Sequence, residues 1–157
     1  MPVSKIRWLG CEFMLLGHVG LNVTELDRSV RFYEEILGFK LKARSDELGK
    51  AFAIFGDEKT TLTLWQQSSG AFSKGLPGLH HLAFEVDSVE QVKKIEEQLR
   101  AHNVILIYEG IVAHQEGADS GGIYFEDPDG IRLEIYTSHG ISGQQCSTTN
   151  GKACGFF

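Results

Sequence analysis

The fold of this chain is decided by two copies of one strand pattern, GHVGLNV at residues 17–23 and HHLAFEV at residues 80–86. Side chains alternate between the two faces of a strand, so each stretch presents an apolar face and a polar or small one. Each copy carries a histidine, His18 or His81, at the same point of the pattern. A third stretch, FEDPDGIRLEIY at residues 125–136, ends in a further strand that carries a carboxylate. The repeat indicates two similar modules.

Each module is predicted to contain one strand, one helix and three further strands. Apolar residues at steps of three and four predict the helices. They are Leu26, Val30, Tyr33 and Leu37 in the first module and Val89, Val92, Ile95 and Leu99 in the second. Runs rich in β-branched and aromatic residues predict the strands. These lie at residues 16–23, 39–44, 51–55 and 60–66, then at 79–86, 104–108, 121–125 and 131–136.

Short polar signals mark the ends of these elements. Thr24 is the predicted N-cap of the first helix, and Gly38 is its C-terminal stop. Asp87 is the predicted cap of the second helix, with Glu90 three residues further on, as in a capping box. The DPDG sequence at residues 127–130 predicts a tight turn, because Pro presets φ and Gly accepts a positive φ.

The chain of 157 residues therefore has an α+β organisation with two fused modules. We expect an N-terminal extension, a first module, a Ser-, Gly- and Pro-containing linker, a second module and a flexible C-terminal tail. Their ranges are residues 1–14, 15–66, 67–77, 78–137 and 138–157.

Composition limits the partners and the compartment. The content is 42% hydrophobic and 23% charged, as in ordinary soluble proteins, and the net charge of −6 argues against nucleic acids or anionic membranes. Apolar runs fall far short of the roughly 20 residues that span a bilayer. Cys11, Cys146 and Cys154 have no paired spacing, which favours free thiols in a reducing cytoplasm.

The candidate chemistry is that of a metal site. His18, His81 and Glu134 all lie on polar strand faces, opposite apolar ones, so these faces are expected to line a wet cleft. Two imidazoles and one carboxylate suit Fe(II), Mn(II), Zn(II), Ni(II) or Co(II) and leave coordination positions open. This ligand set points first to non-haem Fe(II) and oxygen chemistry, with redox-neutral Lewis-acid use as the competitor.

The order of these motifs resembles the vicinal-oxygen-chelate superfamily, which includes glyoxalase I, fosfomycin-resistance transferases, bleomycin-binding proteins and extradiol ring-cleaving dioxygenases. The resemblance covers roughly residues 15–137, and the EDPDG segment followed by L-E is its most specific part. It implies two βαβββ modules that form a cup-shaped mixed sheet with the helices outside. It also implies metal ligands at His18, His81 and Glu134, and a homodimer.

The branch of the superfamily is a separate question. Glyoxalase I-like members have a fourth, carboxylate ligand in the last strand of the first module, but this chain has Leu64 there, with Thr63 beside it. A His and a Tyr at the positions of His114 and Tyr124 bind and polarise the substrate in the dioxygenases. The additional active-site His of those enzymes is replaced by KTTL at residues 59–62. The tyrosine/threonine stretch of the fosfomycin enzymes is also missing.

We expect an extradiol-like Fe(II) dioxygenase that acts on a small bidentate oxygen substrate, with His114 and Tyr124 as the catalytic pair. A metal-free protein that sequesters its ligand, or a three-ligand transferase or isomerase, is the alternative. Four further residues are expected at the substrate: Glu85 and Arg132 share faces with the ligands, and Trp65 and Phe55 are core or pocket wall. The neighbouring His80 is predicted to be structural and to point away from His81.

Overall fold

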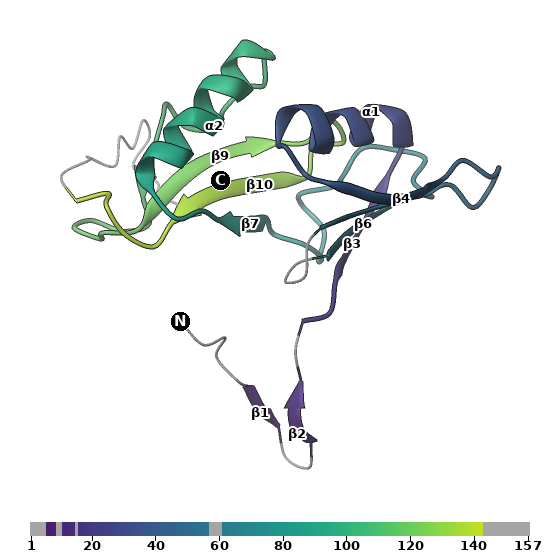
Figure 1. Cartoon of the computed structure of the whole chain (residues 1–157), viewed down its shortest axis with the longest axis horizontal. Helices are drawn as coiled ribbons and strands as arrows, with labels where there is room; N and C mark the ends of the chain where they lie inside the picture. The colour runs from purple at the N-terminus through teal and green to yellow at the C-terminus, as the bar shows by residue number, and fades with distance from the viewer. Residues whose placement is uncertain (1–5, 9–10, 15, 57–60, 143–157) are drawn as a thin grey trace.

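Two four-stranded mixed sheets form the body of the molecule (Figure 1). The computed structural model describes residues 6–8, 11–14, 16–56 and 61–142. The first sheet has the order β3-β6-β5-β4, formed by β3 (Val19–Val23), β4 (Leu41–Ser45), β5 (Phe52–Gly56) and β6 (Thr61–Gln66). The second has the order β7-β10-β9-β8, formed by β7 (Leu82–Glu85), β8 (Val112–Ala113), β9 (Gly121–Glu126) and β10 (Arg132–Thr137).

The helices lie on one side of both sheets. The first module contributes α1 (Leu26–Arg31), which continues as a π-helical turn, η1 (Phe32–Ile36), and the second contributes α2 (Val89–Ala101). Figure 1 shows both helices on the same side, so the opposite sheet faces have no helical cover. The predicted α+β fold of two βαβββ modules is confirmed.

Within each module the first strand pairs in parallel with the last. Leu21 pairs with Leu64 in the first module, and Ala83 pairs with Glu134 in the second. Strand β10 also pairs antiparallel with β9, where Glu134 lies opposite Tyr124. Strand β10, which carries Glu134, therefore lies between β7, which follows His81, and β9, which carries Tyr124.

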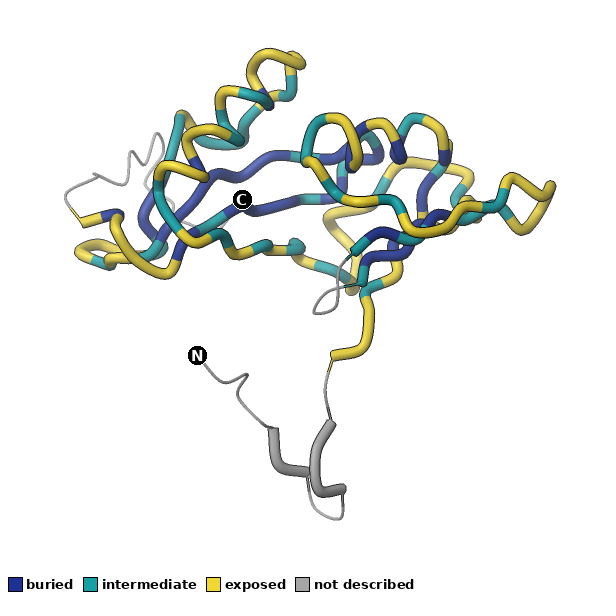
Figure 2. Tube along the Cα trace, viewed as in Figure 1, coloured by how far each residue is buried: buried dark blue, intermediate teal, exposed yellow. Residues whose placement is uncertain are grey.

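One hydrophobic core spans both modules. Tyr33 lies at its centre with no exposed surface, and its ring contacts those of Phe32, Phe39 and Phe55. Most residues of strands β9 and β10 in the second sheet are buried (Figure 2). Because the core side of each sheet faces the helices, the polar side chains of the other face are free to form a site.

The predicted DPDG turn is present and joins the two modules. Asp127 accepts hydrogen bonds from the backbone of Asp129 and Ile131 and from the hydroxyl of Tyr33, at 2.9, 2.8 and 3.1 Å. Asp129 reaches the first module, where Thr24 Oγ1 donates to it at 2.5 Å. The expectation that Thr24 caps α1 is therefore wrong: the N-cap is the next residue, and the Thr24 hydroxyl is used between modules.

The cap of α2 also differs from the prediction by one residue. Ser88, and not Asp87, is the N-cap, and its Oγ accepts from Gln91 N at 3.4 Å. The Gln91 side chain accepts from Asp87 N at 2.8 Å, so it reaches back to the residue before the cap while its own N–H is capped by Ser88.

The expected strand at residues 104–108 does not form. Only an isolated bridge between Leu106 and Phe125 occurs there, and the strand beside β9 is the short β8. The chain turns twice in this region, at Asn103 with φ 58° and at Gly110 with φ 73°. The backbone also bends from residue 107 to residue 110, directly after the bridge, so the pairing with β9 does not extend into a ladder there.

The two ends of the chain lie outside the two sheets and their helices. The N-terminal extension contains a hairpin of β1 (Ile6–Trp8) and β2 (Cys11–Met14), which Figure 1 shows apart from the two sheets. Most of the expected tail, residues 143–157, lies outside the described residues, but Ile141 is buried and its N–H donates to Asp119 O at 3.0 Å. In the part of the chain that the structure describes, no helix has the length and apolar character of a membrane span.

Candidate functional site

A buried carboxylate, that of Glu134, is the centre of the candidate site. Its side chain is 5% exposed, and two imidazoles approach its two oxygens. His81 Nε2 lies 3.2 Å from Oε2, and His114 Nε2 lies 2.7 Å from Oε1. A carboxylate buried this deeply requires such partners, because desolvation of an unpaired charge is costly.

Tyr124 completes the immediate surroundings of Glu134. It lies opposite Glu134 across the β9–β10 ladder, and its hydroxyl donates a hydrogen bond to the carboxylate. Burial raises the pKa of Tyr124 far above its usual value, and the negative charge of Glu134 raises it further. The Tyr124 hydroxyl therefore keeps its proton at neutral pH and remains a donor.

His114 is held from its other side by Ser120. Its Nδ1 lies 2.9 Å from Ser120 Oγ, and the two residues also pair through the backbone, with His114 N donating to Ser120 O at 3.0 Å. The ring of Tyr136 lies 5.4 Å from the His114 ring. His114 was predicted from the sequence, whereas Ser120 was not.

Two glycines in β9, Gly121 and Gly122, let the neighbouring strands β8 and β10 approach closely beside His114. A Cβ atom on Gly121 would lie 2.3 Å from Val112 O, and one on Gly122 would lie 2.1 Å from Ile135 O. Any side chain would therefore displace the neighbouring strands. The Gly-Gly pair within a run of β-forming residues was the available sequence signal, because glycines inside a strand often mark close backbone approach.

The expectation that His80 points away from His81 is wrong. The two Nδ1 atoms lie 2.8 Å apart and the rings meet edge to face, with centroids 5.1 Å apart. Strand β7 begins only at Leu82, so the doublet lies before the regular pleat and simple alternation does not apply.

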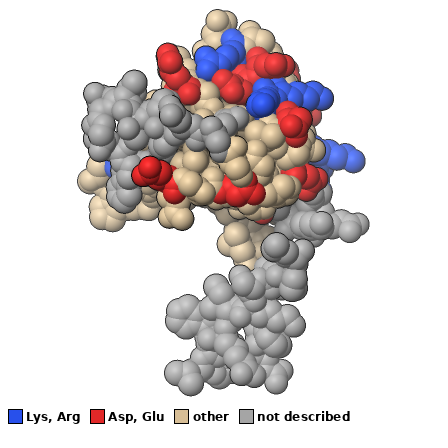
Figure 3. Space-filling model, turned by 90° about the vertical axis from the view of Figure 1, so that its left-hand side faces the viewer, with Lys and Arg blue, Asp and Glu red and all other residues tan. Residues whose placement is uncertain are grey.

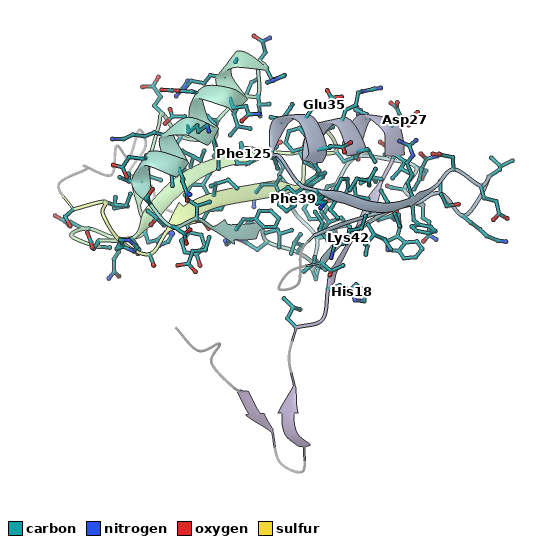
Figure 4. All side chains as sticks on the ribbon, in the orientation of Figure 1. His18, Asp27, Glu35, Phe39, Lys42 and Phe125 are labelled. Atoms are coloured by element: carbon teal, nitrogen blue, oxygen red, sulfur yellow. The ribbon has the colours of Figure 1, made fainter. Side chains whose placement is uncertain are left out.

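His18, the third expected ligand, lies on the other module. It is exposed, just before β3, and Figure 4 shows it at the foot of that strand. Among the described residues, no three His, Cys, Asp or Glu side chains are grouped so that they could hold a metal ion. The structure thus brings together His81, Glu134, His114 and Tyr124, and it does not bring His18 to them within one chain.

The uncovered face of the first sheet carries an aromatic surface. Trp65 is 39% exposed, its Nε1 donates to Thr63 Oγ1 at 3.0 Å, and its ring packs against Phe52 with centroids 5.4 Å apart. Gly20 lies beside it, where a Cβ atom would contact the indole. Phe55 does not belong to this surface: it is fully buried on the core side of β5 beside Tyr33, so its expected role at the substrate is not supported.

The two charged residues expected at the substrate lie on the second sheet. Glu85 is exposed and accepts a hydrogen bond from Tyr136 OH at 3.5 Å. Arg132 is half-buried and precedes Glu134 by two residues on β10, so it shares its face. On the side of the molecule seen in Figure 3, Lys, Arg, Asp and Glu side chains are interspersed over the described surface.

The family follows from a match along most of the chain. Residues 15–135 match the Glyoxalase/Bleomycin resistance protein/Dioxygenase superfamily. The chain belongs to this superfamily. Its members are mostly enzymes, among them dioxygenases, lyases and transferases, and they use divalent metals such as iron, manganese and zinc.

Individual relatives span several activities. The chain is 25% identical over 124 residues to the catechol-2,3-dioxygenase of Bacillus subtilis, matching 77% of this chain but only 40% of that enzyme. It is 27% identical over 122 residues to the metallothiol transferase FosB of Lysinibacillus sphaericus, covering 78% of this chain and 81% of that one. A glyoxalase/bleomycin resistance protein/dioxygenase domain from Frankia sp. superposes with a TM-score of 0.69 at 27% identity, covering 80% of this chain and 98% of the domain.

Proposed function

We propose that this chain is a divalent-metal-dependent enzyme, with His81, Glu134 and His18 as the metal ligands. The observation that carries the proposal is the 3.2 Å contact between His81 Nε2 and Glu134 Oε2. Two atoms that each lie about 2.0–2.2 Å from one metal, at right angles to each other, are about 3 Å apart, so this spacing fits a shared ion. Fe(II) suits the set first, and Mn(II), Zn(II), Ni(II) and Co(II) are alternatives. The ion supplies Lewis-acid or redox chemistry when bound.

The third ligand, in this proposal, comes from a second copy of the chain. His18 is exposed, and both sheets leave one face without helical cover. A twofold dimer that lays the first sheet of one copy over the second sheet of the other would bring His18 to the partner's half-site. Such an interface repeats itself by symmetry, so each dimer would hold two equal sites.

The substrate, in the same proposal, is a small molecule with two neighbouring oxygens. His114 Nε2 and the Tyr124 hydroxyl both lie at Glu134 and on the same sheet face, where they would orient the substrate and hold its proton. Trp65 would cover a planar ring, and Glu85 and Arg132 would border the pocket. This arrangement favours an extradiol-like dioxygenase, in line with the catechol dioxygenase among the relatives.

Elemental analysis of protein purified anaerobically, without chelators, tests the metal. We expect close to one divalent ion per chain, and oxygen uptake with catechols when that ion is Fe(II). A metal content below about one tenth per chain, with no binding of added Fe(II), Mn(II) or Zn(II), would contradict the proposal. Metal without oxygen uptake would favour a transferase or isomerase on the same site.

A metal-free binding protein is the second candidate. The favouring observation is that Glu134 already has two imidazole partners and a tyrosine hydroxyl within the chain. With the aromatic face around Trp65, such a site would sequester a ring-containing ligand. Quenching of Trp65 fluorescence by 4-nitrocatechol in chelator-treated Trp8→Phe protein, without any turnover once metal is restored, would support this function over the enzyme.

A further inference from the structure

The His80–His81 hydrogen bond constrains where the protons of both rings lie. Their Nδ1 atoms are 2.8 Å apart, so the bond needs one Nδ1 that carries a proton and one that does not. The rings are nearly perpendicular, at 77°, which lets the Nδ1–H of one ring point at the lone pair of the other. The contact is therefore directional, in contrast to simple packing of two rings.

The opposite edge of His81 faces Glu134. Its Nε2, 3.2 Å from Glu134 Oε2, is the atom that the proposed function assigns to the metal. A metal-binding nitrogen must be free of its proton, so a neutral His81 ring then carries its proton on Nδ1. The residue in contact with that Nδ1 is His80.

We propose that His80 is a positioning residue that holds His81 in the Nδ1–H form, with Nε2 presented to the metal. This inference rests on the proposed metal function. His81 Nδ1–H donates to His80 Nδ1, which fixes both the tautomer and the rotation of the ligand ring. Partners of this kind raise the affinity of a histidine for its metal, and their loss costs roughly 10–100-fold in binding.

Substitutions at His80 separate this role from simple packing. In His80→Asn, an amide atom stands near the position of Nδ1 and accepts the hydrogen bond, whereas in His80→Gln the amide extends to the position of Nε2. His80→Leu keeps the bulk and removes the acceptor. Because His80 is exposed, all three variants are expected to fold like the wild type, which thermal melts will check. His102→Leu, at another exposed histidine beyond α2, is the matched control.

Zn(II) affinity of the full chain, measured by competition with a chromophoric chelator, is the main readout. We expect roughly 10–100-fold weaker binding for His80→Leu and His80→Gln, with His80→Asn and His102→Leu within about threefold of the wild type. Long-range ¹H–¹⁵N spectra of the Zn(II) form should place the His81 proton on Nδ1 in the wild type and His80→Asn.

The outcomes distinguish failure of the His80 role from failure of the proposed metal function. Wild-type affinity in His80→Leu, or equal losses in the Asn and Gln variants, would overturn the role of His80 while the metal function stands. A His81 proton found on Nε2 in the Zn(II) form would do the same. Failure of the wild type itself to bind Zn(II), Mn(II) or Fe(II) would overturn both.

Discussion

Mixed dimers offer a direct test of how the site is assembled. If His18 serves the partner's half-site, a His18→Ala chain still carries an intact His81 and Glu134, and a Glu134→Gln chain still carries an intact His18. Each homodimer then has no complete site. A heterodimer has one complete site, in which the Glu134→Gln chain supplies His18 and the other chain supplies the rest. Random pairing makes half of the dimers mixed, so about one quarter of the wild-type sites return.

The assay is co-expression of the two variants with different affinity tags, followed by Mn(II) binding per chain in equilibrium dialysis. Tandem purification of the heterodimer alone should double the recovered fraction to about one half. The matched control pairs His81→Ala with Glu134→Gln. Each chain then lacks one ligand of its own His81–Glu134 half-site, so neither site of the heterodimer is complete. No recovery in the first mixture, with a wild type that binds Mn(II), would refute assembly across two copies. Full binding by His18→Ala alone would refute His18 as a ligand.

Three further changes test the surroundings of the site. In Gly122→Ala, the added Cβ meets Ile135 O, so we expect the free energy of unfolding in urea to fall by about 3 kcal/mol and the His114–Glu134 contact to weaken. An unchanged free energy of unfolding would contradict the close approach of the strands. Ser120→Ala removes one hydrogen bond to His114 and should lower kcat about tenfold while the unfolding free energy changes by less than about 1 kcal/mol. Burial raises the pKa of Asp127 to about 6, so its ionisation opposes folding. The stabilisation by the protonated carboxyl is fully present below pH 4 and is lost as the pH rises through 6. The free energy of unfolding of the wild type should therefore fall by about 3 kcal/mol relative to that of Asp127→Asn over this range. Parallel stability curves from pH 4 to 7 would disprove this.

Local patterns were sufficient to predict the two modules. The alternation in β3 and the three- and four-residue steps of Tyr33 and its neighbours are properties of single elements, and each element keeps the face that its own sequence prescribes. The DPDG turn was predictable for the same reason. Thr24 was not, because its hydroxyl bonds Asp129, which is 105 residues away, and no local preference for capping reports such a partner.

The site was predictable in its residue types more than in its geometry. His81 and Glu134 were found because the repeat and the strand alternation place them on one face, and the structure brings them together. Alternation gave the wrong result for His80, since the doublet precedes the regular strand. For Phe55 the two predicted alternatives were core and pocket wall, and the structure places it in the core, on the face of β5 opposite to Phe52.

The burial of Glu134 gives the cluster its meaning. A carboxylate with 5% exposure costs free energy unless its partners replace the water that it loses, and a buried leucine at that position would pack with less penalty. Its partners are not a single arginine or lysine but two imidazoles and a tyrosine hydroxyl, from three different segments. An imidazole nitrogen can donate a hydrogen bond to a carboxylate when it carries a proton, and it can bind a metal ion beside that carboxylate when it does not. In the proposed function, a divalent cation held by His81 Nε2 and Glu134 Oε2 would offset the cost of burying this carboxylate, which would explain why the fold retains it at the open face of the second sheet.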